Sequence, residues 1–492
     1  MTRSAIVIGS GIGGLTAATH LAQADWDVTV LEQNERPGGR CGRFERGGHR
    51  FDTGPTLMVM PLVYEAEFQA MGSSATRVLD LSRVDPTYQL VFDDGSSLSL
   101  TSDRSALADA LECIEPGSAD GLERYMVEGG RHYDFVLDRM VSRDARLSLD
   151  LATVYTGARA LRVKPFARHY RHMSAFFSAP RLKSAFTFQD LYVGLSPFEA
   201  PATFSLLPYS ELAHGVWYPK GGMYSVVEAL VALARQAGVN FQFGASVSGI
   251  ITHSRRAAGV RLRDGSDMGA DVVLANADLP YVYDRLLPPN GVAKSLLRKQ
   301  YSCSAISFFW AVDKPYDALV PHTLFLADDA RANFDAITHG LGLPANPSLY
   351  VHAPASLDPS VAPSGHDSLT AIVPVMHLDE DGRQDWDELR DRAREHVFRR
   401  LASIGVSDVE AHIKFEENLT PVSWARQHNL VKGATHGLSH KLTQMAFFRP
   451  ANRHRHYRNL YFAGASTHPG TGVPMAMISG RLAAQRILAE QP

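Results

Sequence analysis

The stretch from residue 5 to residue 32 constrains the fold of this chain more than any other. A short apolar run over residues 5–8 is followed by Gly9-Ser-Gly11-Ile-Gly13-Gly14, and residues 15–24 are rich in alanine and leucine. A second apolar run, Asp27–Leu31, ends at Glu32. This order predicts a buried parallel strand, a tight turn, a helix and a second strand, which is the βαβ unit of dinucleotide-binding folds.

The glycines and the acid have separate roles in such a unit. Gly9 permits the tight turn, Gly11 lets the backbone approach a pyrophosphate, and Gly14 lets the helix pack closely on the strand, while Gly13 belongs to the same loop. The helix N-terminus offers N–H groups to phosphates. Glu32 stands where a carboxylate accepts hydrogen bonds from ribose hydroxyls. A glycine-rich turn in an ordinary βαβ unit is the alternative; the flanking strand, helix and acid favour dinucleotide binding.

A second glycine-rich loop comes directly after this unit. It contains Gly38-Gly39-Arg40, and the segment Phe51-Asp-Thr-Gly-Pro-Thr56 follows it. Paired glycines let a ligand come close to the backbone, and the arginine beside them can reach back to a diphosphate. Taken alone, Arg40 is better interpreted as a solvated surface residue, but its neighbours favour the phosphate contact.

These segments together resemble the FAD-binding superfamily that includes amine oxidases, protoporphyrinogen oxidase and carotenoid desaturases. The resemblance implies that the cofactor is FAD and that Val247 packs near its adenine. It also adds to the cofactor-binding residues of the βαβ unit the six residues Gly38, Gly39, Arg40, Gly54, Pro55 and Thr56.

Near the end of the chain a predicted strand runs into a third glycine-rich loop. Helical character begins after it and extends over residues 476–489, and Pro474 suits a first helical turn. The N–H groups of such a helix start would favour the negative charge of a reduced flavin. A C-terminal helix packed for stability is the alternative. The loop also matches the closing motif of the superfamily, which adds to the cofactor site Gly464, Gly472, Val473, Pro474 and Met475.

Length and composition exclude several classes of protein. A chain of 492 residues is long enough for two or three domains. The net charge of −3 argues against a nucleic-acid binder. Cys41, Cys113 and Cys303 form no metal-ligand spacing, so we expect no metal and a reducing compartment. The sequence has neither a signal peptide nor an apolar run of spanning length, so we expect a cytoplasmic protein.

The order of the predicted elements indicates an α/β fold in which the chain leaves the nucleotide domain twice and returns. We expect a Rossmann-type FAD-binding domain from residues 1–60, 215–285 and 450–492. An inserted substrate domain with a mixed sheet is expected from residues 61–100 and 286–449, and a helical lobe from residues 101–214. Local patterns predict a β-hairpin over 88–101, helices over 105–112, 121–140, 223–237 and 385–403, and strands over 239–251, 304–312, 348–352 and 368–375.

Residues 151–189 contain no aspartate or glutamate but carry seven lysines and arginines. Aromatic residues lie between these cations, namely Tyr155, Phe166, Tyr170, Phe176 and Phe177. A basic face with apolar residues between its charges can lie on an anionic bilayer surface. A helical lobe whose cations are simply solvated is the alternative.

Several longer stretches narrow the resemblance to the bacterial phytoene-desaturase type of carotenoid desaturase. They lie in residues 51–56, 185–198, 215–223, 349–354, 361–365 and 467–474, and the likeness extends over nearly the whole chain. It implies an enzyme that dehydrogenates phytoene, or a related C30 or C40 polyene, to a more conjugated carotene such as lycopene or neurosporene. Hydride transfer to the flavin and loss of a proton form each new double bond. Relatives that act as 3,4-desaturases, terminal-methyl oxidases or isomerases share these motifs, and an amine-oxidase-like flavoenzyme or a non-catalytic FAD-binding protein is a further alternative.

The acid or base that would handle the proton is not marked by any motif. Asp150 lies where resembling desaturases carry an aspartate proposed for this role, but Thr153 stands about where they have an arginine. A helix cap at Asp150 is an equal alternative. For His352 and His468 a structural histidine is the better interpretation.

The resemblance also implies the partners of the chain. A C40 hydrocarbon resides in the bilayer, because removing each CH₂ from water is worth roughly 0.8 kcal/mol. We therefore expect the protein to associate peripherally with an anionic membrane surface and to draw its substrate from it. Oxygen or a quinone is the expected electron acceptor, and an oligomer on the membrane is compatible with the sequence.

Overall fold

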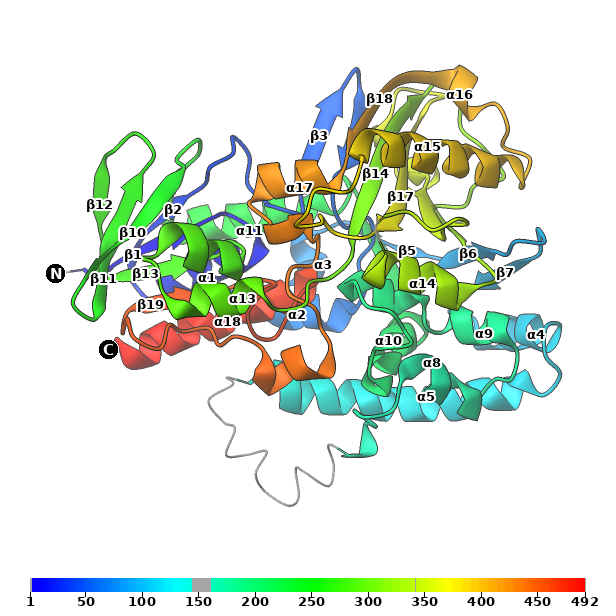
Figure 1. The fold of residues 1–492 in the computed structure, drawn as a ribbon, viewed down its shortest axis with the longest axis horizontal. Coiled ribbons are helices and arrows are strands. Elements are labelled where there is room, and N and C mark those ends of the chain that lie inside the picture. The colour runs from blue at the N-terminus through cyan, green and yellow to red at the C-terminus, as the bar shows by residue number, and fades with distance from the viewer. Residues whose placement is uncertain (1, 144–160, 341, 492) are drawn as a thin grey trace.

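The computed structural model describes residues 2–143, 161–340 and 342–491. Two sheets dominate it, one parallel and one mixed, with helices packed around both (Figure 1). The parallel sheet has the strand order β19-β13-β1-β2-β9. Its strands are β1 (Ser4–Ile8), β2 (Asp27–Leu31), β9 (Asn240–Gln242), β13 (Val272–Ala275) and β19 (Leu460–Phe462). Segments far apart in the chain thus form one sheet, in which Ala5 lies opposite Val272 on one side and Val28 on the other.

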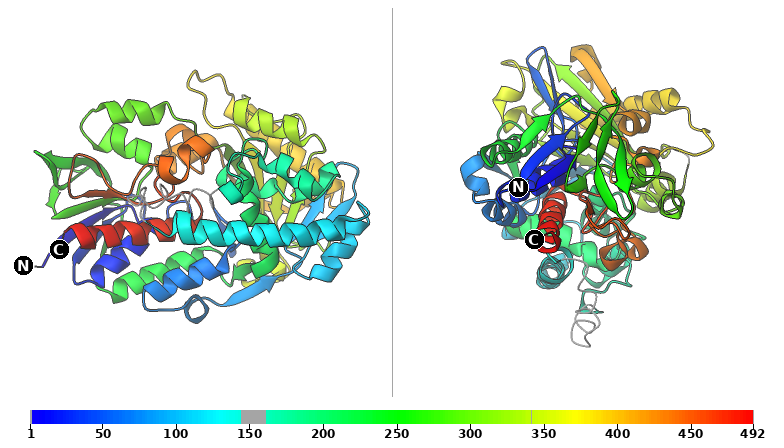
Figure 2. Two further views of the ribbon diagram at one scale, coloured as in Figure 1. Left: turned by 90° about the horizontal axis from the view of Figure 1, so that it is seen from below. Right: turned by 90° about the vertical axis from the view of Figure 1, so that its left-hand side faces the viewer.

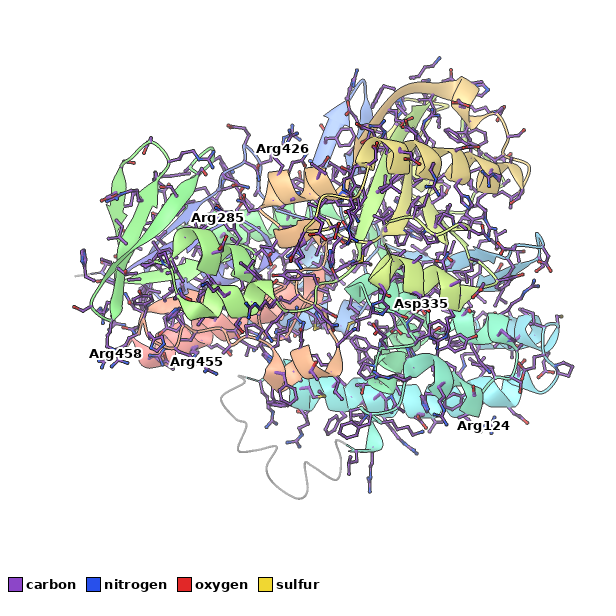
Figure 3. The ribbon with its side chains drawn as sticks, viewed as in Figure 1. Arg124, Arg285, Asp335, Arg426, Arg455 and Arg458 are labelled. Atoms are coloured by element: carbon purple, nitrogen blue, oxygen red, sulfur yellow. The ribbon has the colours of Figure 1, made fainter. Side chains whose placement is uncertain are left out.

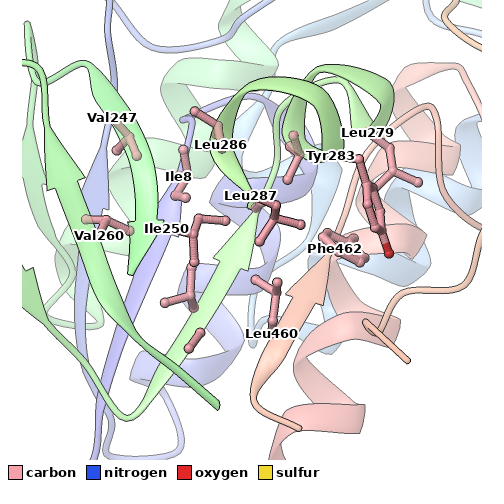
Figure 4. Close-up of a cluster of buried hydrophobic side chains, with 14 of the residues drawn as sticks. Ile8, Val247, Ile250, Val260, Leu279, Tyr283, Leu286, Leu287, Leu460 and Phe462 are labelled. Carbon is pink, nitrogen blue, oxygen red and sulfur yellow. The ribbon is translucent and has the colours of Figure 1, made fainter. Parts of the chain in front are cut away.

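Alternate residues of β1 face opposite sides of this sheet, as the two-residue period of a strand requires. Ala5 and Val7 pack toward α1 (Ile12–Ala22) and α18 (Val473–Glu490), with α11 (Tyr224–Gln236) packed beside α1. Ile6 and Ile8 face a three-stranded antiparallel sheet of β10 (Val247–His253), β11 (Arg256–Leu262) and β12 (Asp267–Gly269). Figure 4 shows the resulting core, in which Val247, Ile250 and Val260 point toward Ile8 and Leu460.

The single strand predicted over residues 239–251 is wrong. The structure has two strands there, because β9 pairs in parallel with β2 whereas β10 begins the antiparallel sheet. Gly244 lies between them with a φ of +68°, a conformation that favours glycine. Both halves of the segment are apolar enough to be strands, so the pattern alone does not reveal the break.

The second large sheet has seven strands in the order β18-β14-β17-β16-β15-β6-β7, and only the β15–β6 pair is parallel. Its strands are β6 (Tyr88–Val91), β7 (Ser97–Leu100), β14 (Ser304–Val312), β15 (His322–Phe325), β16 (Leu349–His352), β17 (Asp367–Val375) and β18 (Ile413–Leu419). One face packs on α15 (Trp386–Ala402), where the Trp310 ring stacks on Phe398 with 4.9 Å between centroids. The opposite face carries Ser307, Tyr350 and Ile372, which line the cavity described below.

Most of the predicted elements are present with small shifts at their ends. The hairpin over 88–101 is the β6–β7 pair, and the three other predicted strands of this sheet are β14, β16 and β17. The helix predicted over 121–140 is α5 (Ser118–Phe135), which continues as the π-helix η1 (Val136–Val141). The predicted domain boundaries stay a prediction.

A group of helices covers the edge formed by β6 and β7. It includes α4 (Arg104–Glu112), α5, α8 (His169–His172), α9 (Pro180–Ala185) and α10 (Leu206–His214). Figure 2 shows α5 in cyan along one side of the molecule. Phe176 and Phe177 are buried in the core of this group, against Leu122 and Tyr125 of α5. They therefore do not belong to an exposed basic and aromatic face, whereas the Phe166 side chain is exposed.

Smaller elements complete the fold. Two short sheets are formed by β3 (Arg43–Arg46) with β4 (His49–Asp52) and by β5 (Leu81–Val84) with β8 (Val216–Pro219). In the part of the chain that the structure describes, no helix is long and apolar enough to cross a membrane. Among the described residues, the remaining α-helices are α2 (Pro61–Ala70), α3 (Ala75–Val78), α12 (Leu279–Tyr281), α13 (Gly291–Leu297), α14 (Ala330–His339), α16 (Val409–His412) and α17 (Pro421–His428).

Candidate active site

A cavity of about 580 Å³ extends from the carboxyl ends of the parallel strands to the inner face of the seven-stranded sheet. Ile8 and Leu31, the last residues of β1 and β2, line one end, and Leu324 and Ile372 of the mixed sheet line the other. The carboxyl end of parallel strands is where open α/β sheets bind their ligands. Most of the lining is apolar, as is usual for a site that holds a large organic ligand.

The structure brings nearly all of the sequence-predicted cofactor residues to this cavity, although they come from widely separated parts of the chain. Gly14 is the exception and does not line it. The predicted residues that do are Gly9, Gly11, Gly13, Glu32, Gly38, Gly39, Arg40, Gly54, Pro55, Thr56, Val247, Gly464, Gly472, Val473, Pro474 and Met475. Their role in binding FAD stays a prediction.

Gly14 serves the shape of the first turn. A Cβ atom on Gly14 would lie 2.2 Å from the carbonyl oxygen of Gly9, a distance that no side chain tolerates. Gly9 itself has a φ of +93°, in the left-handed region. The turn from β1 into α1 therefore needs glycine at both positions, and it aims the amino end of α1 at the cavity.

Glu32 is buried and accepts four hydrogen bonds. Its Oε2 accepts from the Ser10 backbone N–H at 2.9 Å and the Ser10 hydroxyl at 2.7 Å. Its Oε1 accepts from the backbone N–H and the side-chain amide of Asn34, each at 3.0 Å. The carboxylate thus ties the glycine-rich turn to the loop after β2 and also lines the cavity, where it can accept from a ligand hydroxyl.

Arg40 brings a positive charge to the same end of the cavity. Its Nη1 donates to the carbonyl oxygen of Thr435 at 2.8 Å. Burial lowers the pKa of the guanidinium, and the nearby Asp278 opposes this shift by favouring the charged form. Asp278 is held in turn by the Ser466 hydroxyl at 2.5 Å and the Val431 N–H at 3.1 Å.

The glycine-rich loop before α18 is held by an arginine that the sequence did not single out. The buried guanidinium of Arg449 donates to the carbonyl oxygens of Leu438, Ser439, Gln444, Ala465 and Thr467. Burial lowers its pKa to about 9. Five backbone acceptors fix the loop from which α18 starts, with Pro474 in the first turn of that helix. No local pattern around Arg449 could have indicated this role, because its partners lie up to 18 residues away.

The residues at this end fit a dinucleotide that carries a flavin. The amino end of α1 and Arg40 supply donors for a diphosphate, and Glu32 supplies acceptors for hydroxyls. Gly464 and the start of α18 line the cavity beyond them, toward the mixed sheet. Gly13 packs closely on Asn276, since a Cβ on Gly13 would meet the Asn276 Oδ1 at 2.8 Å.

The other end of the cavity is apolar and aromatic, with two groups of polar side chains in its wall. In one, the Tyr350 hydroxyl lies between Thr56 Oγ1 at 2.7 Å and His322 Nδ1 at 2.6 Å. The apolar lining comes mainly from α2 with the segment before it, from η1, from the segment 188–207 and from β15.

The second polar group surrounds a buried carboxyl, that of Glu211. The Tyr88 hydroxyl donates to its Oε1 at 3.3 Å, and the Gln189 side-chain amide donates to its Oε2 at 3.0 Å. Tyr88 is also hydrogen-bonded to the Tyr192 hydroxyl. Burial raises the pKa of Glu211 to about 7, and the neighbouring side chains of Gln189, Tyr192 and Tyr88 oppose this shift.

The predicted acid–base candidates are not part of either group. Asp150 and Thr153 lie outside the described residues. His352 is buried outside the cavity lining, with its Nδ1 at 2.8 Å from the Pro321 carbonyl oxygen and its ring stacked on His322, which supports a structural role. His468 does line the cavity, with Nε2 at 3.0 Å from the Arg143 carbonyl oxygen.

Comparison with known proteins identifies the family. The sequence model of the flavin-containing amine oxidoreductase family matches residues 12–488. The chain is 40% identical to a phytoene desaturase of Fusarium fujikuroi, covering 99% of this chain and 90% of that protein. It is also 40% identical to the zeta-carotene-forming phytoene desaturase of Myxococcus xanthus, covering 99% and 94%. The chain belongs to the carotenoid desaturase family of flavin-dependent oxidoreductases.

The same architecture occurs in solved structures. Putrescine oxidase with bound putrescine matches over 99% of both chains, with a TM-score of 0.66 and 16% identity. At this identity the likeness concerns the fold alone. The fold class predicted from the sequence, α/β with a parallel sheet and a mixed sheet, is therefore confirmed, as is the flavin.

Proposed function

We propose that this protein desaturates phytoene, or a related C30 or C40 polyene, to a more conjugated carotene such as neurosporene or lycopene. The observation that carries the proposal is one continuous cavity with two different ends. One end has the donors and acceptors for a dinucleotide, and the other has walls of leucine, methionine, valine and aromatic side chains. A hydrocarbon needs such walls and few polar partners. Membership in the carotenoid desaturase family supports the same substrate class.

The residues at the dinucleotide end would hold FAD, which supplies an acceptor for hydride when bound. The amino end of α1 and Arg40 face its diphosphate, and Glu32 its ribose. The walls at the other end position the polyene and exclude water, which leaves the few polar side chains there as the groups available to receive a proton.

Turnover of a defined polyene tests this proposal. Purified protein is incubated with FAD and phytoene-loaded liposomes, and the products are followed by visible absorption and by mass. We expect new absorption bands, each accompanied by the loss of two hydrogens. Phytoene recovered unchanged, with the flavin bound, would contradict phytoene as the substrate. The same assay with a C30 analogue then separates the two chain lengths.

We also propose that one side of the molecule docks on an anionic membrane. Leu161, Phe166 and Phe448 expose 61%, 74% and 66% of their surface. The segments 161–166 and 442–448 and helix α5 all lie on the lower side of the molecule in Figure 1. Met445 and Ala446, close to Phe448 in the chain, line the cavity, as do residues of η1. A polyene leaving the bilayer at this side would therefore enter at the apolar end.

Exposed arginines lie in and after the segment 161–166 and on α5. Arg162, Arg168 and Arg171 are exposed in the same part of the chain. Arg124 on α5 is also exposed and lies at the lower right of Figure 3. Exposed aromatic side chains together with arginines favour binding at the interface of an anionic bilayer. A cytoplasmic protein attached peripherally to the membrane, with oxygen or a quinone as electron acceptor, is the arrangement we infer.

We keep the division into three domains as a further part of the proposal. The parallel sheet takes strands from the first 31 residues, from residues 240–275 and from residues 460–462, which supports a discontinuous FAD-binding domain. Limited proteolysis of the flavin-bound protein, with cleavage sites mapped by mass, tests where the boundaries lie.

A further inference from the structure

We propose that Glu211 receives the proton that the substrate loses, through the hydroxyl groups of Tyr88 and Tyr192. The inference rests on the proposed desaturation and assigns the acceptor for its second step. Tyr88 and Tyr192 line the apolar end of the cavity, whereas Glu211 lies behind them on α10 and does not reach it. The hydroxyl groups of Tyr88 and Tyr192 therefore stand between the carboxyl and the cavity.

The hydrogen bonds form a chain in one direction. Tyr88 donates to Glu211 Oε1 at 3.3 Å, so the oxygen of Tyr88 is left to accept from the Tyr192 hydroxyl, to which it is bonded. A proton taken up at the Tyr192 oxygen can move on as each hydroxyl passes its own proton to the next acceptor. At the end of the transfer both tyrosines are neutral again and the Glu211 carboxylate has become a carboxylic acid.

The step balances with a flavin as the oxidant. After a hydride has been removed from an allylic carbon to the flavin, the substrate is a delocalised cation. The neighbouring C–H bond then breaks, its electron pair becomes the second bond of the new C=C, and its proton goes to Tyr192 and on to Glu211. In sum the substrate would lose two electrons and two protons, of which both electrons and one proton go to the flavin as hydride and the other proton goes to Glu211.

Gln189 can partner Glu211 in both protonation states. The Gln189 side chain is completely buried, and its Nε2 donates to Glu211 Oε2 at 3.0 Å, while its Oε1 has no hydrogen-bond partner among the described residues. A buried acceptor without a partner is costly. If the side-chain amide of Gln189 rotates so that its nitrogen and oxygen exchange places, its oxygen accepts a hydrogen bond from a protonated Glu211. The same residue thus serves the carboxylate as a donor and the acid as an acceptor.

Burial makes Glu211 a better proton acceptor than His322, which belongs to the polar group around Tyr350. There, the Tyr350 hydroxyl contacts His322 Nδ1 at 2.6 Å. A proton on His322 would create a buried charge, and burial accordingly lowers its pKa well below the usual value. A proton on Glu211 removes a buried charge, so desolvation favours the transfer and raises its pKa to about 7.

In the part of the chain that the structure describes, the titratable groups that face Glu211 from neighbouring elements are phenols. They are Tyr88 on β6, Tyr192 in the segment 188–193 and Tyr125 on α5. Burial raises the pKa of all three well above the usual value, so they stay neutral while Glu211 titrates. A change of protonation near pH 7 at this place belongs to Glu211.

The test compares Glu211→Gln and Tyr192→Phe with a matched control, Asp367→Asn. Asp367 is also buried, and burial raises its pKa to about 6, but it lies outside the cavity lining and accepts the N–H groups of Ser368 and Ala355 on its Oδ1, which asparagine retains. In Glu211→Gln, the rotated side-chain amide of Gln189 can form a hydrogen bond with the amide introduced at position 211, so the variant keeps its local hydrogen bonds.

Two measurements decide the matter. Infrared spectra of the flavin-bound protein without substrate should contain a carboxylic-acid band that titrates near pH 7, is absent in Glu211→Gln and remains in Asp367→Asn.

Turnover of phytoene should rise with pH through about 7 in the wild type and in Asp367→Asn. In Glu211→Gln it should be roughly 100-fold slower and lack this rise. In Tyr192→Phe it should be slower while the infrared band stays.

The outcomes separate the proton route from the proposed function. If the wild type turns over phytoene and Glu211→Gln does so at the same rate and with the same pH profile, the route through Glu211 is overturned. The route is also overturned if the infrared spectra contain no carboxylic-acid band that titrates near pH 7 and depends on Glu211. A wild-type protein that leaves every polyene unchanged would instead overturn the proposed function, and the route with it.

Discussion

Ser10 donates both its backbone N–H and its hydroxyl to one carboxylate oxygen of Glu32, at 2.9 and 2.7 Å. The residue in the middle of the glycine-rich turn is thereby fixed to the residue that follows β2. The Glu32 carboxylate closes the turn and, by lining the cavity, also presents acceptors to a ligand. The acid of this sequence motif therefore has a structural role besides its expected contact with ribose.

Replacing Glu32 with alanine should weaken FAD binding by roughly 100-fold, since hydrogen bonds to a charged group are worth about 1.5–3 kcal/mol each. Fluorescence titration of the apoprotein with FAD measures the change. Ser10→Ala removes one of the four donors to Glu32 and leaves the carboxylate in place, so its effect should be several-fold at most. Equal losses in the two variants would mean that Glu32 only holds the turn.

Gly480 is the contact point between α18 and the dinucleotide turn. A Cβ at this position would lie 2.3 Å from the Gly13 carbonyl oxygen. Gly480→Ala should therefore push α18 away from α1, lowering the stability by about 1–3 kcal/mol and reducing the flavin content of the purified protein. Denaturant unfolding and the flavin-to-protein absorbance ratio measure the two effects. Gly291→Ala is the matched control, because a Cβ at the start of α13 has open space.

Asp52 caps a helix that lies far from it in the sequence. Its carboxylate accepts the N–H of Met223 at 2.6 Å and that of Tyr224 at 3.1 Å, at the amino end of α11. Asp52→Ala leaves these two donors without an acceptor and should cost about 1–3 kcal/mol of unfolding free energy. Asp52→Asn keeps an acceptor oxygen and should lose less. Thermal unfolding of both variants with FAD in excess checks the order, and equal losses would contradict the capping role.

The sequence predicted elements and site residues well where the interacting residues are close along the chain, and less well where they are far apart. The turn from Gly9 to Gly14 and the acid at residue 32 belong to one βαβ unit, so spacing alone predicted them. Gly244 divides an apolar run between two sheets, and that choice depends on β2 and β11, which the local pattern does not contain. Glu211 is the only acidic residue between positions 200 and 227, so no local pattern marks it.

The group around Glu211 could not be predicted for the same reason. Tyr88 is 123 residues away from Glu211 in the chain, and Gln189 is 22 residues away. Neither spacing corresponds to a helical or strand period. The family resemblance instead directed attention to Asp150, in a segment outside the described residues. A buried acid among tyrosines becomes visible only when β6 and α10 are placed side by side.

The exposed phenylalanines should determine membrane affinity. Burying a large apolar side chain is worth about 1.5–3 kcal/mol, so Phe166→Ser and Phe448→Ser should each weaken binding to anionic liposomes by roughly tenfold or more. Cosedimentation at low and at high salt measures this, and high salt should weaken the wild type as well. Val292→Ser on α13, where 40% of the valine surface is exposed, is the control and should bind as the wild type does. Wild-type protein that stays in solution at low salt would contradict the docking surface.

The raised pKa of Glu211 predicts how stability depends on pH. A carboxyl whose pKa moves from 4.5 in the unfolded chain to about 7 in the fold binds its proton more tightly when folded. Between these values the folded state therefore holds more protons, so its stability falls as the pH rises. One unit of pKa corresponds to about 1.4 kcal/mol, and the full loss is on the order of 3 kcal/mol. Glu211→Gln lacks the titrating group and should lose correspondingly less stability between pH 5 and pH 8.

Denaturant unfolding of the wild type and of Glu211→Gln at pH 5, 6, 7 and 8 measures this difference. Asp367 contributes a loss of the same sign, because burial raises its pKa too, but that loss is common to both proteins and cancels in the comparison. The free energy of unfolding of the variant, relative to that of the wild type, should therefore rise steadily up to about pH 7 and stay constant above it. A difference that does not change with pH would mean that Glu211 titrates like an exposed carboxyl. With its pKa raised by burial, Glu211 is mostly ionised above pH 7, where the wild type is less stable than it is at pH 5. The ionised carboxylate is the form that accepts a proton, so the pH that lowers the stability of the fold is the one that favours the reaction.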